Sequence, residues 1–192
     1  MTSILEVEQL DTLSSNASST LTIGGTNTTT IAFGPNVTTT PSSLANTPAF
    51  KYVKTSAQSI SNNTFTKVTF DNGILDTDSA VSSSTFTVPT GKGGQYLIGA
   101  NIFTAASGVT RYIYGNLYIV VNDTFRSQSN TDFRNSYYTY THNLLVSDVL
   151  DLSAGDTVEI QGRINDSTSS PSFGADTTNY QTYFYGFKLI GA

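Results

Sequence analysis

The chain has 192 residues and a formal net charge of −5, and only 12% of its residues are charged. Its nine Lys and Arg are scattered singly and it has no cysteine, which excludes a basic nucleic-acid-binding surface, a disulfide framework and a thiolate metal site. No apolar run approaches the roughly 20 residues that span a bilayer, and the first residues lack a signal-peptide pattern, so we expect cytoplasmic synthesis without membrane insertion.

The composition favours an all-β protein. Serine, threonine and aromatic residues are abundant, with 11 Tyr and 11 Phe, whereas the strong helix formers are scarce. β-branched and aromatic side chains suit the pleated, half-buried surface of a strand, and the many Ser, Asn and Gly residues suit the turns between strands.

Residues 1–48 are predicted to form an N-terminal anchor followed by a β-repeat stem. No charged residue occurs between Thr12 and Phe50, and the segment Thr20–Gly24 is echoed by Thr30–Gly34. Two such short strands cannot bury their apolar side chains alone, so the repeat favours an intertwined stem made by three copies of the chain. Its expected contact residues are Ile23, Ile31 and Phe33. The alternative is a disordered Ser/Thr-rich linker.

Residues 49–192 are predicted to form a separate β head. Strand-like runs follow one another without an intervening helix, and polar turns separate them, among them Asp71–Gly73, Asn122–Asp123 and Ala154–Asp156. The predicted strands are 50–55, 65–71, 83–88, 95–104, 112–121, 137–146, 157–163 and 180–190. Eight or more short strands in this arrangement are typical of a sandwich or a barrel.

Two of these strands are too apolar to stand at an exposed position. The run 112–121 is apolar on both faces, with Tyr118 on one of them, which indicates that another subunit packs outside it. The closing run 180–190 is too apolar for an exposed edge, so we expect it to lie between neighbouring strands.

The head resembles the globular head of complement C1q. The resemblance rests on Ala49-Phe50-Lys51-Tyr52, on Thr85-Phe86-Thr87-Val88-Pro89 followed by Gly94-Gln95-Tyr96, on Leu150–Val158, and on Phe184-Tyr185-Gly186-Phe187-Lys188-Leu189. It implies a ten-strand jelly roll of the C1q and tumour-necrosis-factor (TNF) superfamily that assembles as a homotrimer. The closing strand would then lie near the threefold axis, with Phe184 and Gly186 at a subunit contact. The collagen repeats of complement proteins are missing, and the stem resembles those of phage and algal-virus fibres.

Catalysis finds little support in the residue pattern. The only histidine, His142, falls inside a predicted strand, where a structural role is the simpler interpretation. No cofactor is required. Calcium is a candidate ligand, because loop carboxylates suit hard cations and some relatives of such heads bind calcium; the candidate ligands are Asp71, Asp76 and Asp78.

Two polar segments, 125–138 and 165–179, are predicted to be distal loops that recognise a host-surface glycan or protein. Their candidate binding residues are Arg126, Asn130, Asp132, Arg134, Tyr137, Phe173 and Asp176. The simpler alternative is that they are only solvated loops.

The leading hypothesis is a non-enzymatic homotrimer on a virion surface, acting as a fibre, spike or capsid decoration. It would join other virion proteins through its N-terminus and attach to the host through its head. The first alternative is a lectin-like binding module of a bacterial surface or spore coat, and the second is a polysaccharide depolymerase.

Overall fold

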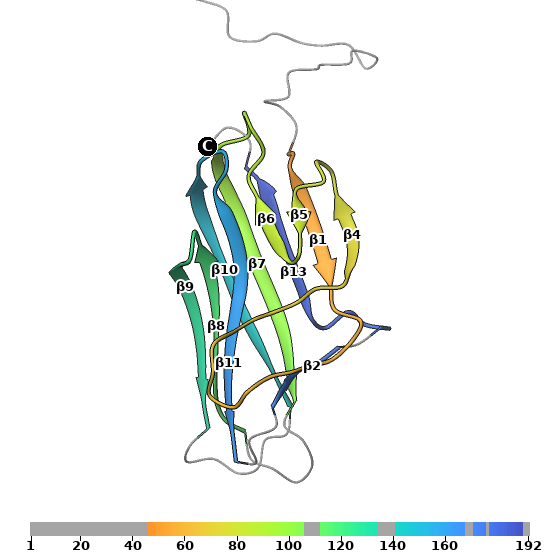
Figure 1. Ribbon diagram of the computed structural model, residues 1–192, viewed down its shortest axis with the longest axis vertical. Helices are drawn as coiled ribbons and strands as arrows, with labels where there is room; N and C mark the ends of the chain where they lie inside the picture. Colours follow the sequence, from red (N-terminus) through yellow and green to blue (C-terminus); the bar gives the residue numbers. More distant parts are fainter. Residues whose placement is uncertain (1–45, 106–111, 134–140, 168–170, 176, 190–192) are drawn as a thin grey trace, which may run out of the picture. The chain divides into compact units, whose positions relative to one another are not determined.

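The computed structural model describes residues 46–105, 112–133, 141–167, 171–175 and 177–189, and Figure 1 shows their arrangement. Every regular element among them is a strand, and no helix there could span a membrane. The predicted stem, with Ile23, Ile31 and Phe33, lies outside the described residues. The strands are β1 Ala49–Val53, β2 Gln58–Ser59, β3 Thr66–Lys67, β4 Asn72–Asp76, β5 Val81–Ser82, β6 Thr85–Thr87, β7 Gly94–Ala105, β8 Tyr112–Val121, β9 Thr124–Asp132, β10 Thr141–Leu152, β11 Thr157–Asp166, β12 Ser172–Phe173 and β13 Tyr183–Lys188.

The strands form two antiparallel sheets. Sheet A has the order β2-β12-β7-β13-β1-β4, and β10 also pairs with β7. Sheet B has the order β5-β6-β11-β8-β9, and β3 also pairs with β11. The closing strand β13 lies between β7 and β1, so the expectation that it has a neighbour on each side is confirmed. The all-β, two-sheet jelly roll is confirmed as well.

The core fills the space between the sheets. Alternate residues of β7 and β11 point inward and are fully buried, among them Tyr96, Ile98, Ile160 and Ile164. Aromatic rings fill one end of this core, where Phe50 stacks on Phe86 at 4.6 Å between ring centroids and meets Phe184 edge-on at 4.8 Å. Burying such large apolar side chains is the main stabilising contribution to the fold.

Phe184 and Gly186 belong to this core. Phe184 has no exposed surface, and a Cβ added at Gly186 would lie 2.6 Å from Ile98 and 2.8 Å from Phe50 of the same chain. The prediction that these two residues contact a neighbouring subunit is therefore wrong, because both point inward.

Several segments differ from the predicted strands and turns. β9 was predicted as a loop because it is polar; it is an edge strand of sheet B, and most of its side chains are exposed. The predicted turn at Asp71–Gly73 is wrong, since Asn72 and Gly73 begin the edge strand β4. The predicted strand 83–88 starts with a turn, because Ser83 and Ser84 adopt positive φ values of 49° and 61° between β5 and β6.

The turn predicted at Asn122–Asp123 is confirmed. Both residues have positive φ, 48° and 60°, and they connect β8 to β9 directly. A two-residue turn of this kind matches the twist of a hairpin, and Asn and Asp tolerate its left-handed backbone. The turn therefore sets the register in which β8 and β9 pair.

Candidate functional site

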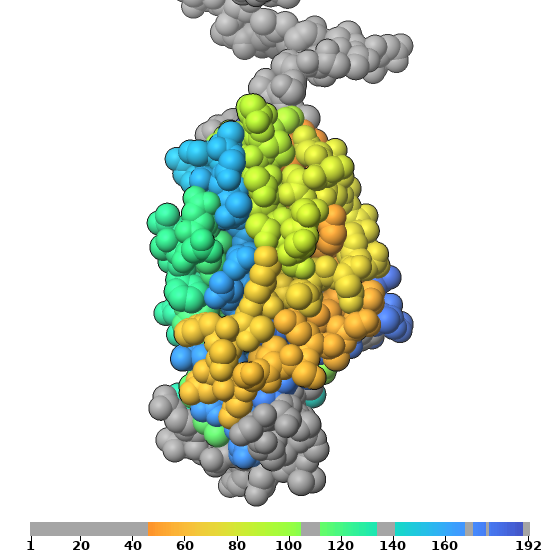
Figure 2. All heavy atoms as spheres, in the orientation of Figure 1, coloured from red at the N-terminus to blue at the C-terminus, as the bar shows by residue number. Residues whose placement is uncertain are grey.

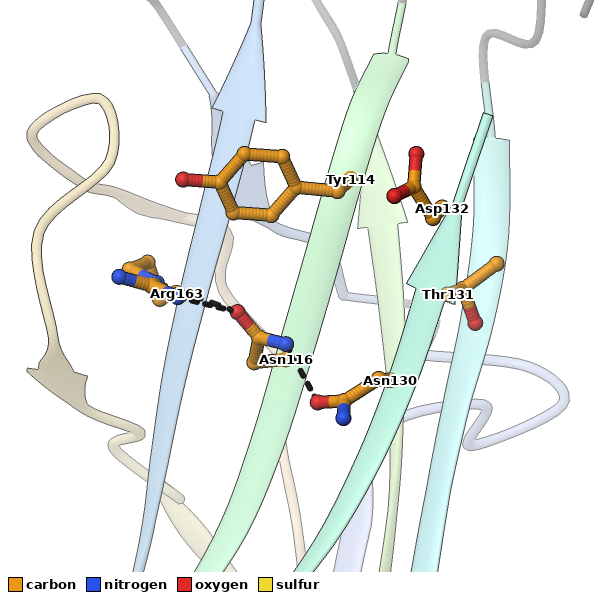
Figure 3. Close-up of a pocket in the computed structure, with 6 residues that line it drawn as sticks. All are labelled: Tyr114, Asn116, Asn130, Thr131, Asp132 and Arg163. Carbon is orange, nitrogen blue, oxygen red and sulfur yellow. Dashed lines mark hydrogen bonds between the residues drawn. The ribbon is translucent and has the colours of Figure 1, made fainter. Parts of the chain in front are cut away.

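The outer face of sheet B carries a polar groove built from three neighbouring strands. Asn116 on β8 pairs with Arg163 on β11 and with Asn130 on β9. Two residues before Asn116 on the same strand, Tyr114 pairs with Asp132 of β9. Side chains of one face recur at every second residue, so all five point away from the core. They line a pocket of about 360 Å³ together with Thr131, here called the B groove (Figure 3).

Hydrogen bonds hold the floor of the B groove in place. The Nε and Nη2 atoms of Arg163 both donate to Asn116 Oδ1, at 3.1 and 2.8 Å. Asn116 Nδ2 in turn donates to Asn130 Oδ1, and Figure 3 shows the three side chains in one line. Asn116 is only 9% exposed. Its amide oxygen positions Arg163 and its amide nitrogen positions Asn130.

Aromatic rings fix the remaining freedom of Arg163. The centre of its guanidinium lies 4.5 Å from the Phe65 ring centroid and 5.3 Å from that of Tyr114. The Tyr114 hydroxyl donates to Asn63 Oδ1. A guanidinium over aromatic faces is attracted by the ring quadrupole. Among the described residues, no carboxylate forms an ion pair with Arg163.

An aromatic patch adjoins the B groove and consists of Phe65, Tyr118 and Phe125. Ring centroids are 4.6 Å apart for Tyr118 and Phe125, 5.2 Å for Phe65 and Phe125, and 5.4 Å for Phe65 and Tyr118. Phe65 remains 40% exposed and Phe125 46% exposed.

This patch changes the interpretation of Tyr118. Its ring is covered by Phe65 and Phe125 of the same chain, so the two-sided apolar character of β8 needs no second subunit outside it. In Figure 2 the orange segment between β1 and β4, from which Phe65 comes, lies across the lower part of sheet B.

The predicted loop residues fall into four groups. Asn130 and Asp132 line the B groove, but they do so from strand β9. Arg126 instead lines a second hollow of about 270 Å³ with Asn122, Asp151 and Asp156, at the end of the sandwich. Phe173 is fully buried in the core, so its prediction as a binding residue is wrong. Arg134, Tyr137 and Asp176 lie outside the described residues.

Arg163, Asn116 and Tyr114 complete the B groove but were not among the predicted binding residues. All three lie inside predicted strands. Along β11, buried and partly exposed residues alternate strictly, and Arg163 lies between the buried Gly162 and Ile164. That alternation alone places Arg163 on the outer face, and it is the signal by which the sequence could have identified it.

Asp71 and Asp76 do not share one site. Asp71 immediately precedes β4 and Asp76 is its last residue, so five steps along the chain, roughly 16 Å in a strand, separate them. Asp71 accepts hydrogen bonds from Thr55 and Ser56, which follow β1, and Asp76 accepts hydrogen bonds from the backbone of Ala80 and Val81.

Asp78 also has local partners, since it accepts a hydrogen bond from Thr77 Oγ1 and lies 3.9 Å from the Lys92 ammonium. In the part of the chain that the structure describes, no three His, Asp or Glu side chains gather where a metal ion could bind. The expected grouping of Asp71, Asp76 and Asp78 around calcium is therefore wrong.

His142 packs between rings at the edge of the core. Its Nε2 lies 3.0 Å from Thr131 Oγ1, and its ring meets Phe133 edge-on at 5.2 Å. Burial disfavours the charged imidazolium and lowers the pKa of His142. These contacts are those of a structural histidine.

The outer face of sheet A is the second large surface. Tyr183, Tyr185 and Phe187 of β13 alternate with the buried Phe184 and Gly186, so they point outward. The Tyr185 ring lies across Gly99, where an added Cβ would be 2.6 Å from it. The same face of sheet A also carries Leu75, Leu97, Leu145 and Val149. These seven residues are here called the A face.

The A face exposes large apolar side chains in the single chain, and the exposed Lys51 lies among them between Tyr185 and Leu75. Leu145 is 56% exposed, Val149 51% and Leu75 47%. Large exposed apolar side chains gathered on one face of a soluble protein are typical of an interaction surface.

The fold was compared with known proteins. No family model matches the sequence, and no curated protein matches it. Among solved structures, murine APRIL is similar with 12% identity over 73% of this chain and 98% of that chain, at a TM-score of 0.53. Eiger TNF of S. frugiperda is similar with 15% identity over 75% and 93% of the two chains, also at 0.53.

The globular domain of zebrafish complement 1qA protein aligns with 16% identity over 74% of this chain and 97% of that chain, at a TM-score of 0.49. The fold of the head is thus similar to the jelly rolls of murine APRIL and Eiger TNF. At these identities, the likeness describes the fold.

Proposed function

We propose that the chain is a non-enzymatic, homotrimeric attachment protein of a virion surface. The three copies meet through the A face, and the B groove points outward to the ligand. The observation that carries the proposal is the apolar A face on a fold of the C1q and TNF type, in which the sequence resemblance implies a trimer with the closing strand near the axis.

The physical case for self-association rests on the position of the exposed apolar side chains. Leu145 and Val149 of β10 lie on one edge of the face and Leu75 of β4 on the other, with Tyr185 and Phe187 between them. Burying these side chains against another copy removes their apolar surface from water, at about 25 cal/mol per Å². The outer face of sheet B has a polar groove at its centre and suits a solvated surface instead.

A mass measurement tests the trimer. The full chain should sediment at three times its monomer mass, and the double substitution Leu145→Asp and Val149→Asp should give monomers, because each buried carboxylate would lose its hydration. Gln128→Asp introduces one such carboxylate on the outer face of sheet B and should leave the trimer intact. A wild-type monomer at micromolar concentration contradicts the proposal.

The virion location is supported by the charge-free repeat before the head, which favours a stem made by several chains. Immunogold labelling of intact particles tests this location. Label on the particle surface is expected. Label confined to a bacterial surface or spore coat would instead support the lectin-like alternative.

A further inference from the structure

We infer that the B groove and its adjoining aromatic patch bind a glycan, so that hydroxyl groups enter the groove while a sugar ring lies on the patch. This inference rests on the proposed attachment function and names the class of ligand. It is carried by three properties of the outer face of sheet B: its hydrogen-bonding groups, its exposed rings and its rigidity.

The B groove presents both donors and acceptors. Within the described residues, Arg163 uses Nε and Nη2 to bind Asn116, and Nη1 makes no hydrogen bond. Asn130 accepts through Oδ1, which leaves its Nδ2 hydrogens directed at solvent. Asp132 adds an exposed carboxylate. A sugar hydroxyl both donates and accepts, so a pair of neighbouring hydroxyls can accept from Arg163 or Asn130 and donate to Asp132.

The aromatic patch supplies an apolar platform next to these groups. Phe65 and Phe125 expose 40% and 46% of their surface, and Tyr118 supports both from beneath. Pyranose rings carry C–H groups on one face, and those groups are attracted by the negative face of an aromatic ring. Because Phe65 also contacts Arg163, the platform and the polar groove form one continuous surface.

The surface is held in its binding geometry before a ligand arrives. The Arg163 guanidinium is held by two hydrogen bonds and by two rings, and Asn130 is held through Asn116. Less side-chain freedom is then lost on binding, which favours affinity for a weakly bound ligand such as a sugar.

The charge of the face argues against a polyanion of the nucleic-acid kind. Among the described lining residues of the groove, Arg163 is the one cation, and Asp132 lines the same pocket. From Tyr114 to Tyr118 the surface runs four residues along β8, or about 13 Å, which suits a short oligosaccharide. Three outward-facing copies on a trimer would add avidity to a weak single site.

Binding of the full-length trimer to a printed array of neutral and acidic oligosaccharides identifies the glycan, and calorimetry then measures its affinity. Phe125→Ala and Asn130→Ala should each weaken binding at least about fivefold, because both remove a direct contact. Arg163→Lys keeps the charge but loses the planar fork, and it should also weaken binding.

The matched control is Asp151→Asn compared with Asp132→Asn. Both carboxylates are exposed on edge strands, but Asp151 belongs to sheet A. Only Asp132→Asn should weaken binding, and circular dichroism should show that both variants fold.

Two results would overturn the inference. One is a trimer that binds no glycan of the array, including one that binds a host protein in its place. The other is a bound glycan whose affinity is unchanged in all of the groove variants. In either case the trimer mass can still be intact, so this failure is separate from a failure of the proposed assembly.

Discussion

Gly186 shows how a single residue shapes the interior of the head. It lies on β13 where the Ile98 and Phe50 side chains of the neighbouring strands converge on it. The position was expected at a contact between subunits, because close approach of backbones is a common reason for a glycine in a strand. The close approach is real, but it occurs inside the core of one chain.

Gly186→Ala should therefore lower the free energy of unfolding without dissociating the trimer. The new methyl group would meet Ile98 and Phe50 at 2.6 and 2.8 Å, and overpacking of this kind costs about 1–3 kcal/mol. Urea denaturation measures the loss, and sedimentation measures the assembly. A variant of unchanged stability that sediments as a monomer would show that Gly186 faces a neighbouring subunit after all.

At the scale of elements, the junction between β1 and β4 depends on Asp71. Its carboxylate accepts hydrogen bonds from the backbone and hydroxyl of Thr55, at 2.6 and 2.9 Å, and from the backbone of Ser56 at 3.0 Å. Burial raises the pKa of Asp71, but these hydrogen bonds and the nearby Lys54 charge outweigh it, so the net shift is downward.

Asp71 should make the head sensitive to acid. Because its folded pKa is below its unfolded value, its stabilisation is present above about pH 4 and is lost as the pH falls through the folded pKa. Asp71→Asn should cost at most about 1 kcal/mol at pH 7, since the group is exposed, and little at pH 2. Urea midpoints at the two pH values test this. An equal loss at both would contradict the assigned role of the charge.

The predictability of an element depended on which of its faces is buried. β8 and β11 could be predicted because their apolar residues are frequent or alternate strictly, whereas β9 exposes most of its polar side chains and has no such pattern.

The B groove could be predicted only in part. Asn130 and Asp132 were recognised as polar residues outside the core, but Arg163 meets Asn116 through a strand pairing that joins residues 47 apart. Local sequence does not fix such pairings.

The whole molecule presents two faces with different chemistry. The A face is apolar, with Leu145 and Val149 more than half exposed, while the outer face of sheet B combines the polar groove with a small aromatic patch. The two lie on opposite sides of one sandwich, so a trimer that buries the A face leaves all three grooves accessible. Assembly and ligand binding would then use separate surfaces of the same domain.

Thiol labelling of single-cysteine variants tests this central claim most directly, because the natural chain has no cysteine. Ser147 lies on the A face opposite Gly99, and Gln128 lies on the outer face of sheet B opposite Tyr118; both are exposed in the single chain. In the assembled protein, the cysteine of Ser147→Cys should react slowly and that of Gln128→Cys rapidly, and dilution to monomers should remove the difference. Equal rates in the assembled protein would contradict an assembly through the A face.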